Sequence, residues 1–280
     1  MNQSQRAHLY VAAKSHPGMS GKNNEDNFAV TAYSLGPNNP TPSVFAIVSD
    51  GIGGHRAGEV ASEMAVNLIS DAVANSDGGH PLAVFQESFY RASESIYEQA
   101  DLDATRKGMG ATVSCVWIVG QQLYIGYAGD SRIYLMRDGK IQQISRDHTW
   151  IQEAIEKGLL DRSQVKGHPN MHVIRRFLGS SEPPEPDLRL FLNSTDSDSK
   201  ARANQGTTLK PGDVIMMCSD GLTDLVNDSE ILETISGATF SQAIDTLIAL
   251  ANQRGGHDNI TVVMLGMPFT PGSGPAWVQG

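Results

Sequence analysis

One short pattern occurs twice in the sequence, as VFAIVSDG at residues 44–51 and as VIMMCSDG at residues 214–221. In each copy, an apolar run typical of a buried β-strand ends in Ser-Asp-Gly. Such a strand places its aspartate, Asp50 or Asp220, at the rim of a sheet, and the glycine lets the backbone turn sharply towards a ligand. Asp-Gly is also a common turn. Two copies weaken that simpler interpretation without excluding it, and they make both aspartates candidate metal ligands.

Further acidic residues lie next to predicted strands or to these aspartates: Glu25, Asp26, Asp130, Asp224 and Asp258. Each one alone could be a solvated turn or a helix cap. Brought together without cations, however, neighbouring carboxylates would repel each other and raise each other's pKa. Hard divalent ions relieve this repulsion, and a ligand set made of oxygens favours Mg²⁺ or Mn²⁺ over zinc.

Length and composition indicate an ordinary globular protein. A chain of 280 residues with 40% hydrophobic content can bury a substantial core, which we expect to be one domain over residues 1–267 with a Gly- and Pro-rich tail at 268–280. The net charge of −10 argues against nucleic acid as a partner. Residues 1–9 are polar, and no run of about 18 apolar residues occurs. We therefore expect a cytoplasmic protein without a membrane partner.

Strands and helices are predicted in alternating groups. The expected strands are residues 8–14, 27–32, 44–49, 112–119, 122–128, 132–137, 141–144, 213–219 and 259–267. The expected helices are residues 59–74, 81–100, 151–157, 229–236 and 241–252. This order predicts an α+β fold, a four-layer α-β-β-α sandwich of two mainly antiparallel sheets flanked by helical pairs. Residues 148–177 are interpreted as a flap over a site, and residues 193–206 as a polar loop with little to bury.

The two cysteines, Cys115 and Cys218, lie inside apolar runs, where buried free thiols are the expected state. A cysteine phosphatase would need an arginine shortly after its thiolate. The residues six positions further on are Gln121 and Asp224, so this mechanism is excluded. A phosphate-binding loop with Gly-rich turn and Lys-Ser/Thr pair is also missing from the sequence.

Eight short motifs occur in a fixed order between residues 8 and 266: NED (24–26), DGIGGH (50–55), GAT (110–112), GDSR (129–132), DH (147–148), RFLG (176–179), SDGLTD (219–224) and GHDN (256–259). Each motif is weak by itself. Together and in this order they resemble the motif set of the type 2C (PPM) metal-dependent serine/threonine protein phosphatases, in the bacterial stand-alone form. The predicted hairpins, helices and layers agree with the fold of that family.

The resemblance implies a role for each matching residue. Asp50, Asp220 and Asp258 would ligate one Mg²⁺ or Mn²⁺ ion and form the catalytic core, while Glu25, Asp50 and the Gly51 carbonyl would serve the other. Asp26 and Asn259 would orient these ligands from behind. Bacterial relatives often hold a third, weaker ion, for which Asp130, Asp220 and Asp224 are the matching positions. A water or hydroxide activated between the two ions would then attack the phosphoryl group in line.

Some positions depart from the family pattern. Many relatives place a phosphate-clamping arginine where this chain has Gly21; the neighbouring Lys22 could supply a point charge without the bidentate fork of arginine, or could be solvated. Eukaryotic members have a histidine where this chain has Ile52. His55 lies nearby and is given no catalytic role.

Two further motif residues favour structural roles. We expect Arg132 to form a salt bridge and His148 to pack at the base of the flap.

The resemblance implies an enzyme that hydrolyses phosphoserine and phosphothreonine in proteins and opposes a serine/threonine kinase. Its partners would be phosphorylated proteins, including that kinase and its targets, and we expect a monomer. A regulatory binding protein that keeps the fold without turnover is the alternative. The presence of every metal-ligand position argues against it. Another two-metal phosphoesterase, such as a nuclease, conflicts with the acidic composition and the motif order.

Overall fold

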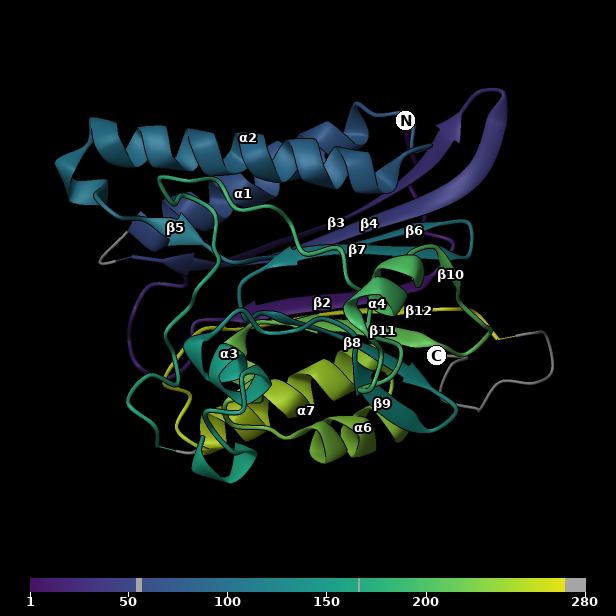
Figure 1. The fold of residues 1–280 in the computed structure, drawn as a ribbon. Coiled ribbons are helices and arrows are strands. Elements are labelled where there is room, and N and C mark those ends of the chain that lie inside the picture. Colours follow the sequence, from purple (N-terminus) through teal and green to yellow (C-terminus); the bar gives the residue numbers. More distant parts are fainter. Residues whose placement is uncertain (54–56, 166, 270–280) are drawn as a thin grey trace.

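Two antiparallel β-sheets stack face to face, and helices cover the outer face of each sheet (Figure 1). This arrangement is seen in a computed structural model that describes residues 1–53, 57–165 and 167–269. It confirms the predicted four-layer α+β sandwich. His55 and residues 270–280 of the predicted tail lie outside the described residues.

The first sheet has the strand order β1-β3-β4-β6-β7-β10, and the short β5 pairs with the end of β4. Its strands are β1 (Asn2–Gln3), β3 (Asp26–Gly36), β4 (Asn39–Ile52), β5 (Gly110–Ala111), β6 (Val113–Val119), β7 (Gln122–Ala128) and β10 (Thr207–Thr208). The second sheet has the order β2-β12-β11-β8-β9. Its strands are β2 (Tyr10–His16), β8 (Arg132–Arg137), β9 (Lys140–Gln143), β11 (Val214–Cys218) and β12 (Ile260–Gly266).

The two strands that carry the repeated pattern are interior strands. β4 lies between β3 and β6, and β11 lies between β12 and β8. Because successive side chains point to opposite faces, β4 buries Val44, Ala46 and Val48 between the sheets. Phe45 and Ile47 face the helices. Because both faces of each strand are buried, the sequences of β4 and β11 are continuous apolar runs rather than alternating ones.

Helices α1 (Ala57–Ala74) and α2 (Pro81–Leu102) cover the first sheet, and α6 (Asp228–Ser236) and α7 (Phe240–Gln253) cover the second. Three apolar layers result, one between each helical pair and its sheet and one between the sheets. Capping boxes begin α6 and α7, at Asn227 and Thr239. The remaining helices are α3 (Trp150–Glu156), α4 (Asp198–Ala203), α5 (Asp220–Thr223) and the 3₁₀ turns η1 (Ala104–Arg106) and η2 (Arg162–Gln164).

The prediction of a polar loop at residues 193–206 was wrong in part, because this segment contains α4. Ser197 caps the helix by accepting a hydrogen bond from the Lys200 N–H. Ala201 is fully buried, and the Asn204 side chain donates to the Leu190 carbonyl oxygen at 2.9 Å. One small apolar residue and one buried amide are enough to fix a segment that looked too polar to pack.

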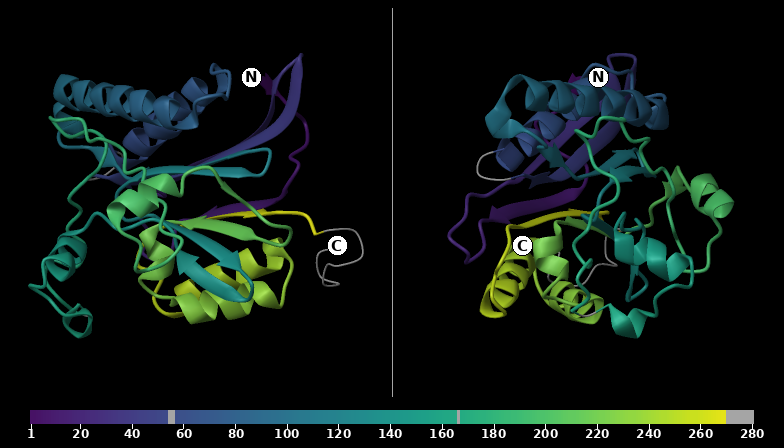
Figure 2. Two further views of the ribbon diagram at one scale, coloured as in Figure 1. Left: turned by 45° about the vertical axis from the view of Figure 1, so that its right-hand side comes forward. Right: turned by 60° about the vertical axis from the view of Figure 1, so that its left-hand side comes forward.

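Residues 148–177 leave the sheets and contain α3, as the teal segment of Figure 2 shows. Trp150 stacks on His168 with ring centroids 5.0 Å apart, and a bridge pairs Thr149 with Ile174. The predicted flap is therefore an ordered segment outside the sheets, held by contacts among its own residues.

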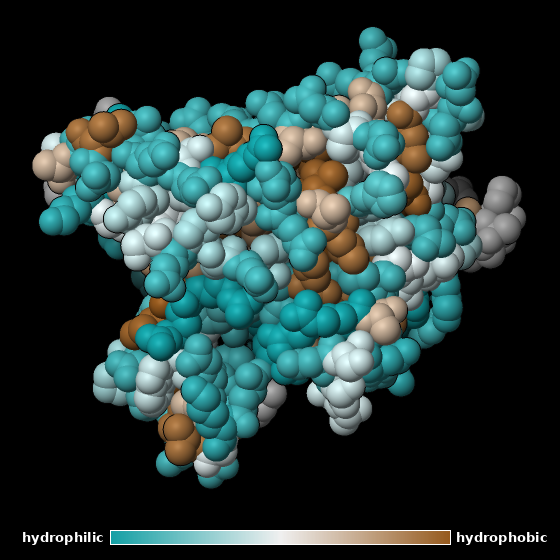
Figure 3. Space-filling model, turned by 45° about the horizontal axis from the view of Figure 1, so that its top comes forward, coloured by the Kyte–Doolittle hydropathy of each residue, from teal (hydrophilic) through white to brown (hydrophobic). Residues whose placement is uncertain are grey.

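On the side seen in Figure 3, hydrophobic residues form separate patches within a mainly hydrophilic surface. Such scattered residues do not mark a docking face. Within the described part of the chain, every helix is too short or too polar to cross a membrane.

The apolar layer under α2 predicts the effect of a matched pair of substitutions. Phe89 is fully buried, whereas the adjacent Tyr90 is 49% exposed. We expect Phe89→Ala to lower the free energy of unfolding by about 3–5 kcal/mol, because it leaves a cavity. Tyr90→Ala should cost less than about 1 kcal/mol. Denaturant titration measures both, and equal losses would contradict the assignment of this layer.

Candidate metal centre

Both sheets deliver carboxylates to one rim of the sandwich. Asp50 lies near the end of β4, directly opposite Asp26 at the start of β3. Asp220 follows β11 as the first residue of α5. The Ser219 hydroxyl donates to Asp26 Oδ2 at 2.7 Å, although the two residues are 193 positions apart. This bond joins the end of β11 in the second sheet to the start of β3 in the first sheet, beside Asp50.

Asn259, directly before β12, links the second sheet to the same rim. Its side-chain oxygen accepts from the Glu25 N–H at 2.7 Å, and its side-chain amide donates to the carbonyl oxygens of Pro17 and Asn23. The Asn259 backbone N–H donates to Asp258 Oδ1 at 2.9 Å. Asn259 therefore orients Glu25 through its side chain and Asp258 through its backbone.

Thr112, the last residue of the GAT motif, had no role assigned to it from the sequence, and it holds Asp50. Its hydroxyl oxygen accepts from the Asp50 N–H at 3.0 Å, and its own N–H donates to the Asp50 carbonyl at 2.8 Å. The Gly51 N–H donates to the Glu25 carbonyl at 3.1 Å. A Cβ on Gly51 would lie 2.2 Å from the Gly58 carbonyl oxygen, so only glycine permits this approach of β4 to the start of α1.

The grouped carboxylates perturb one another strongly. Burial raises the pKa of Asp50 well above its usual range, and the charges of Asp26 and Asp220 raise it further. Burial and then the charge of Asp130 likewise raise the pKa of Asp220. The pKa of Asp130 rises to about 7, mainly because of burial. These shifts show that the predicted ligands lie close enough to repel each other.

Several carboxylate oxygens are buried and have no hydrogen-bond partner among the described residues: Glu25 Oε1, Asp26 Oδ1, Asp130 Oδ1 and Asp220 Oδ1. Buried polar atoms normally have partners, and uncompensated buried charge is costly. Hard divalent cations would satisfy the oxygens of Glu25, Asp130 and Asp220, so this donor set fits Mg²⁺ or Mn²⁺.

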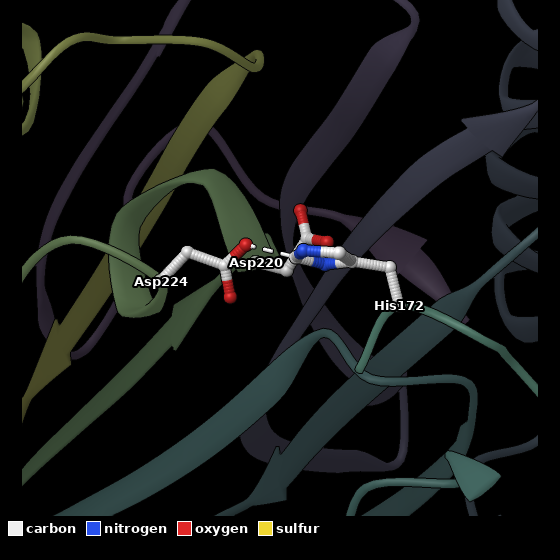
Figure 4. Close-up of side chains that lie close together, drawn as sticks. All are labelled: His172, Asp220 and Asp224. Carbon is white, nitrogen blue, oxygen red and sulfur yellow. Dashed lines mark ion pairs between the residues drawn. The ribbon is translucent and has the colours of Figure 1, made fainter. Parts of the chain in front are cut away.

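The positions matched to a third ion also converge, and the structure adds a residue that the sequence analysis missed. His172, from the flap, lies beside Asp220 and Asp224, and ligand atoms of all three lie within 4.8 Å of one another (Figure 4). Burial raises the pKa of Asp224, while the charge of His172 opposes the rise. A histidine in an irregular polar segment carries no periodic or capping signal, so sequence reasoning could not select it.

Lys22 is exposed, and its charge lowers the pKa of Glu25 against the larger effect of burial, which places it near the rim. Gly21 has a φ of +73°, and a Cβ there would meet no atom within 4 Å. An arginine at this position would have space but would need a left-handed backbone that side chains disfavour. Glycine is therefore favoured at position 21 by the backbone conformation and not by a lack of space.

Arg132 and His148 have the structural roles that were expected. Arg132 donates to Asp147 through Nε and Nη2, the latter at 2.7 Å. His148 stacks on Tyr127, accepts from the Gly129 N–H at Nδ1, and contacts Asp187 Oδ2 through Nε2 at 3.1 Å. Because Nδ1 accepts, a neutral His148 ring carries its proton on Nε2 and donates it to Asp187. His148 thus supports the backbone next to Asp130.

Comparison with known proteins agrees with this geometry. The sequence profile described as protein phosphatase 2C matches residues 18–154. The serine/threonine phosphatase stp of Listeria innocua is 31% identical over 262 residues, covering 92% of this chain and 95% of the relative. PstP of Mycobacterium tuberculosis is 33% identical over 256 residues, but this chain spans only 44% of its length.

Solved structures show the same likeness. The Streptococcus agalactiae serine/threonine phosphatase superimposes with a TM-score of 0.80 at 30% identity, covering 92% of this chain and 99% of the other. The catalytic domain of PstP in complex with two manganese ions superimposes with a TM-score of 0.74 at 31% identity, covering 92% and 97%. By sequence along nearly its whole length and by fold, this chain belongs to the protein phosphatase 2C family of serine/threonine protein phosphatases.

Proposed function

We propose that this chain removes phosphate from phosphoserine and phosphothreonine in proteins with the help of two divalent cations, Mg²⁺ or Mn²⁺. The observation that carries the proposal is the set of buried carboxylate oxygens that have no partner among the described residues. The manganese-bound PstP structure supports the choice of ion. In this proposal residues 1–267 act as one catalytic unit, a monomer that opposes a serine/threonine kinase in the cytoplasm.

We assign the ligands as the motif match implies. Asp50, Asp220 and Asp258 would hold one ion, and Glu25, Asp50 and the Gly51 carbonyl the other. Asp130, Asp220 and Asp224 would hold a third. When bound, such ions acidify water at neutral pH and neutralise the charge on the phosphoryl oxygens.

The chain's own residues prepare this site before any substrate arrives. Ser219, by its bond to Asp26, fixes the relative position of the two sheets at the rim. Thr112 and Asn259 fix the backbones of Asp50 and Glu25. Preorganised ligands need not rearrange during the reaction, which is how a rigid scaffold contributes to rate. Lys22 would attract the substrate phosphate from the edge of the site.

Removal of one ligand tests the function. We expect hydrolysis of p-nitrophenyl phosphate and of a phosphothreonine peptide to require Mn²⁺ or Mg²⁺ and to stop in EDTA. Asp220→Asn should reduce the rate at least about a hundredfold, because several kcal/mol of charge stabilisation are lost. Asp245→Asn makes the same change on an exposed residue that pairs with Lys14, and should leave activity intact. If the folded parent protein hydrolyses neither substrate with any ion, the chain would instead be a regulatory binding protein.

The raised pKa values predict how metal-free stability depends on pH. The pKa of Asp130 is about 7 in the folded protein and about 3.9 when unfolded, so its stabilising contribution is lost as the pH rises towards 7. Asn imitates the protonated form. In EDTA, Asp130→Asn should therefore gain about 2–3 kcal/mol relative to the parent between pH 5 and pH 7.5.

Comparing variant with parent cancels the opposite contribution of His148, whose pKa is lowered by burial. Asp138→Asn, in the exposed β8–β9 turn, is the control. The difference in free energy of unfolding between this variant and the parent should be the same at both pH values. Denaturant titration at the two pH values gives the result. A pH-independent difference for Asp130→Asn would show that this carboxylate is not under repulsion.

The position of Lys22 predicts a binding effect. Lys22→Ala should raise KM for the phosphopeptide about three- to tenfold with little change in kcat, because an exposed charge contributes about 1 kcal/mol. Lys140→Ala, an exposed lysine in the β8–β9 hairpin, serves as the control. An unchanged KM in Lys22→Ala would mean that this lysine is only solvated.

A further inference from the structure

His172, in the flap, lies beside the carboxylates of Asp220 and Asp224. Its Nδ1 is 3.5 Å from Asp224 Oδ2, and Figure 4 shows the imidazole and both carboxylates converging from different parts of the chain. Asp220 begins α5 and Asp224 follows its last turn, where the Asp224 N–H donates to the Asp220 carbonyl at 2.8 Å. The two carboxylates are therefore fixed by the helix, and the imidazole is supplied by a separate segment.

The flap backbone fixes His172 from both sides. The Val173 N–H donates to the Asn170 carbonyl at 3.2 Å, and the Val173 carbonyl accepts from the Trp150 N–H at 2.9 Å. The Arg175 N–H donates to the His148 carbonyl at 2.7 Å. Since the chain is held immediately before and after His172, the position of this residue follows from the fold of the flap.

A simple ion pair accounts poorly for this cluster. The separation of 3.5 Å is too long for a good hydrogen bond, and His172 is 59% exposed, where an ion pair contributes little. Asp130, only 7% exposed, adds its charge to Asp220 and Asp224, and its Oδ1 has no hydrogen-bond partner among the described residues. One partly exposed imidazole cannot offset three carboxylates, whereas a divalent ion can.

The spacing suits such an ion. Ligands at about 2.0–2.2 Å from a metal lie about 3–4.4 Å from one another in octahedral geometry. The three candidate ligand atoms lie within 4.8 Å, so a small closing movement of the flap would complete the site.

We propose that His172 is a nitrogen ligand of the third divalent ion, which it shares with Asp220 and Asp224, so that ion binding draws the flap onto the site. This inference rests on the proposed function, because the third ion belongs to that metal centre. Mn²⁺ and Mg²⁺ both bind oxygen well, but Mg²⁺ gives up its water reluctantly, so Mn²⁺ accepts an imidazole nitrogen more readily. The flap would therefore close with Mn²⁺ and much less with Mg²⁺.

Pulsed electron paramagnetic resonance of the full chain loaded with Mn²⁺ tests the proposal directly. The proposed two-ion core has only oxygen ligands, so nitrogen bonded to Mn²⁺ must come from the third site. We expect a ¹⁴N coupling in the parent protein that disappears in His172→Gln. His257→Gln is the matched control, because His257 also acts on Asp224, and this variant should keep the coupling. Affinity for the weakest Mn²⁺ should fall at least about tenfold in His172→Gln.

Hydrogen exchange of the flap gives a second readout that does not involve activity. Mn²⁺ should protect the backbone amides of residues 170–175 in the parent, Mg²⁺ should protect them less, and His172→Gln should abolish the difference. Two tightly bound Mn²⁺ ions with no ¹⁴N coupling would overturn the role of His172 and leave the proposed function standing. Failure of the parent to bind Mn²⁺ at all would overturn both.

Discussion

Carboxylates repel one another at the rim where the two sheets meet, and the protein holds them there against a large electrostatic cost. Asp50 lies near the end of β4 and Asp220 just beyond the end of β11, both interior strands, so neither can withdraw without moving the core of its sheet. Burial and the charges of neighbouring carboxylates raise the pKa values of both aspartates. Buried carboxylates held this close together attract cations strongly, and the surrounding structure prevents the carboxylates from moving apart.

The scaffold meets this cost with apolar layers and with a few long-range hydrogen bonds. Three hydrophobic clusters lock the helices and sheets together. At the rim itself, the bond from Ser219 to Asp26 joins one sheet to the other, and Asn259 reaches from the second sheet to the backbone of Glu25. Each of these bonds replaces water with a fixed partner, so the ligands cannot relax away from one another.

The family resemblance implies that many members bind the phosphate with an arginine at the position of Gly21. In this chain the backbone at Gly21 is left-handed, and the exposed Lys22 follows it. The ammonium group of Lys22 would offer the phosphate a single point charge, whereas an arginine would offer a planar, bidentate guanidinium. Recognition of the substrate would then rest more on the metal ions and on the flap. The folded contacts of the flap, with Trp150 stacked on His168, fit a segment that takes part in the site.

The sequence by itself determined the order of strands and helices, the layered fold and the carboxylates at the strand ends, because these are local signals: apolar periodicity, capping residues and Ser-Asp-Gly at the end of a buried run. It did not determine α4, which depends on burial of Ala201 and Asn204. Nor did it reveal that Thr112 of the GAT motif bonds to Asp50, or that His172 lies beside Asp224. Those contacts join residues far apart in the chain, and only the packing of the layers and the folding of the flap bring them together.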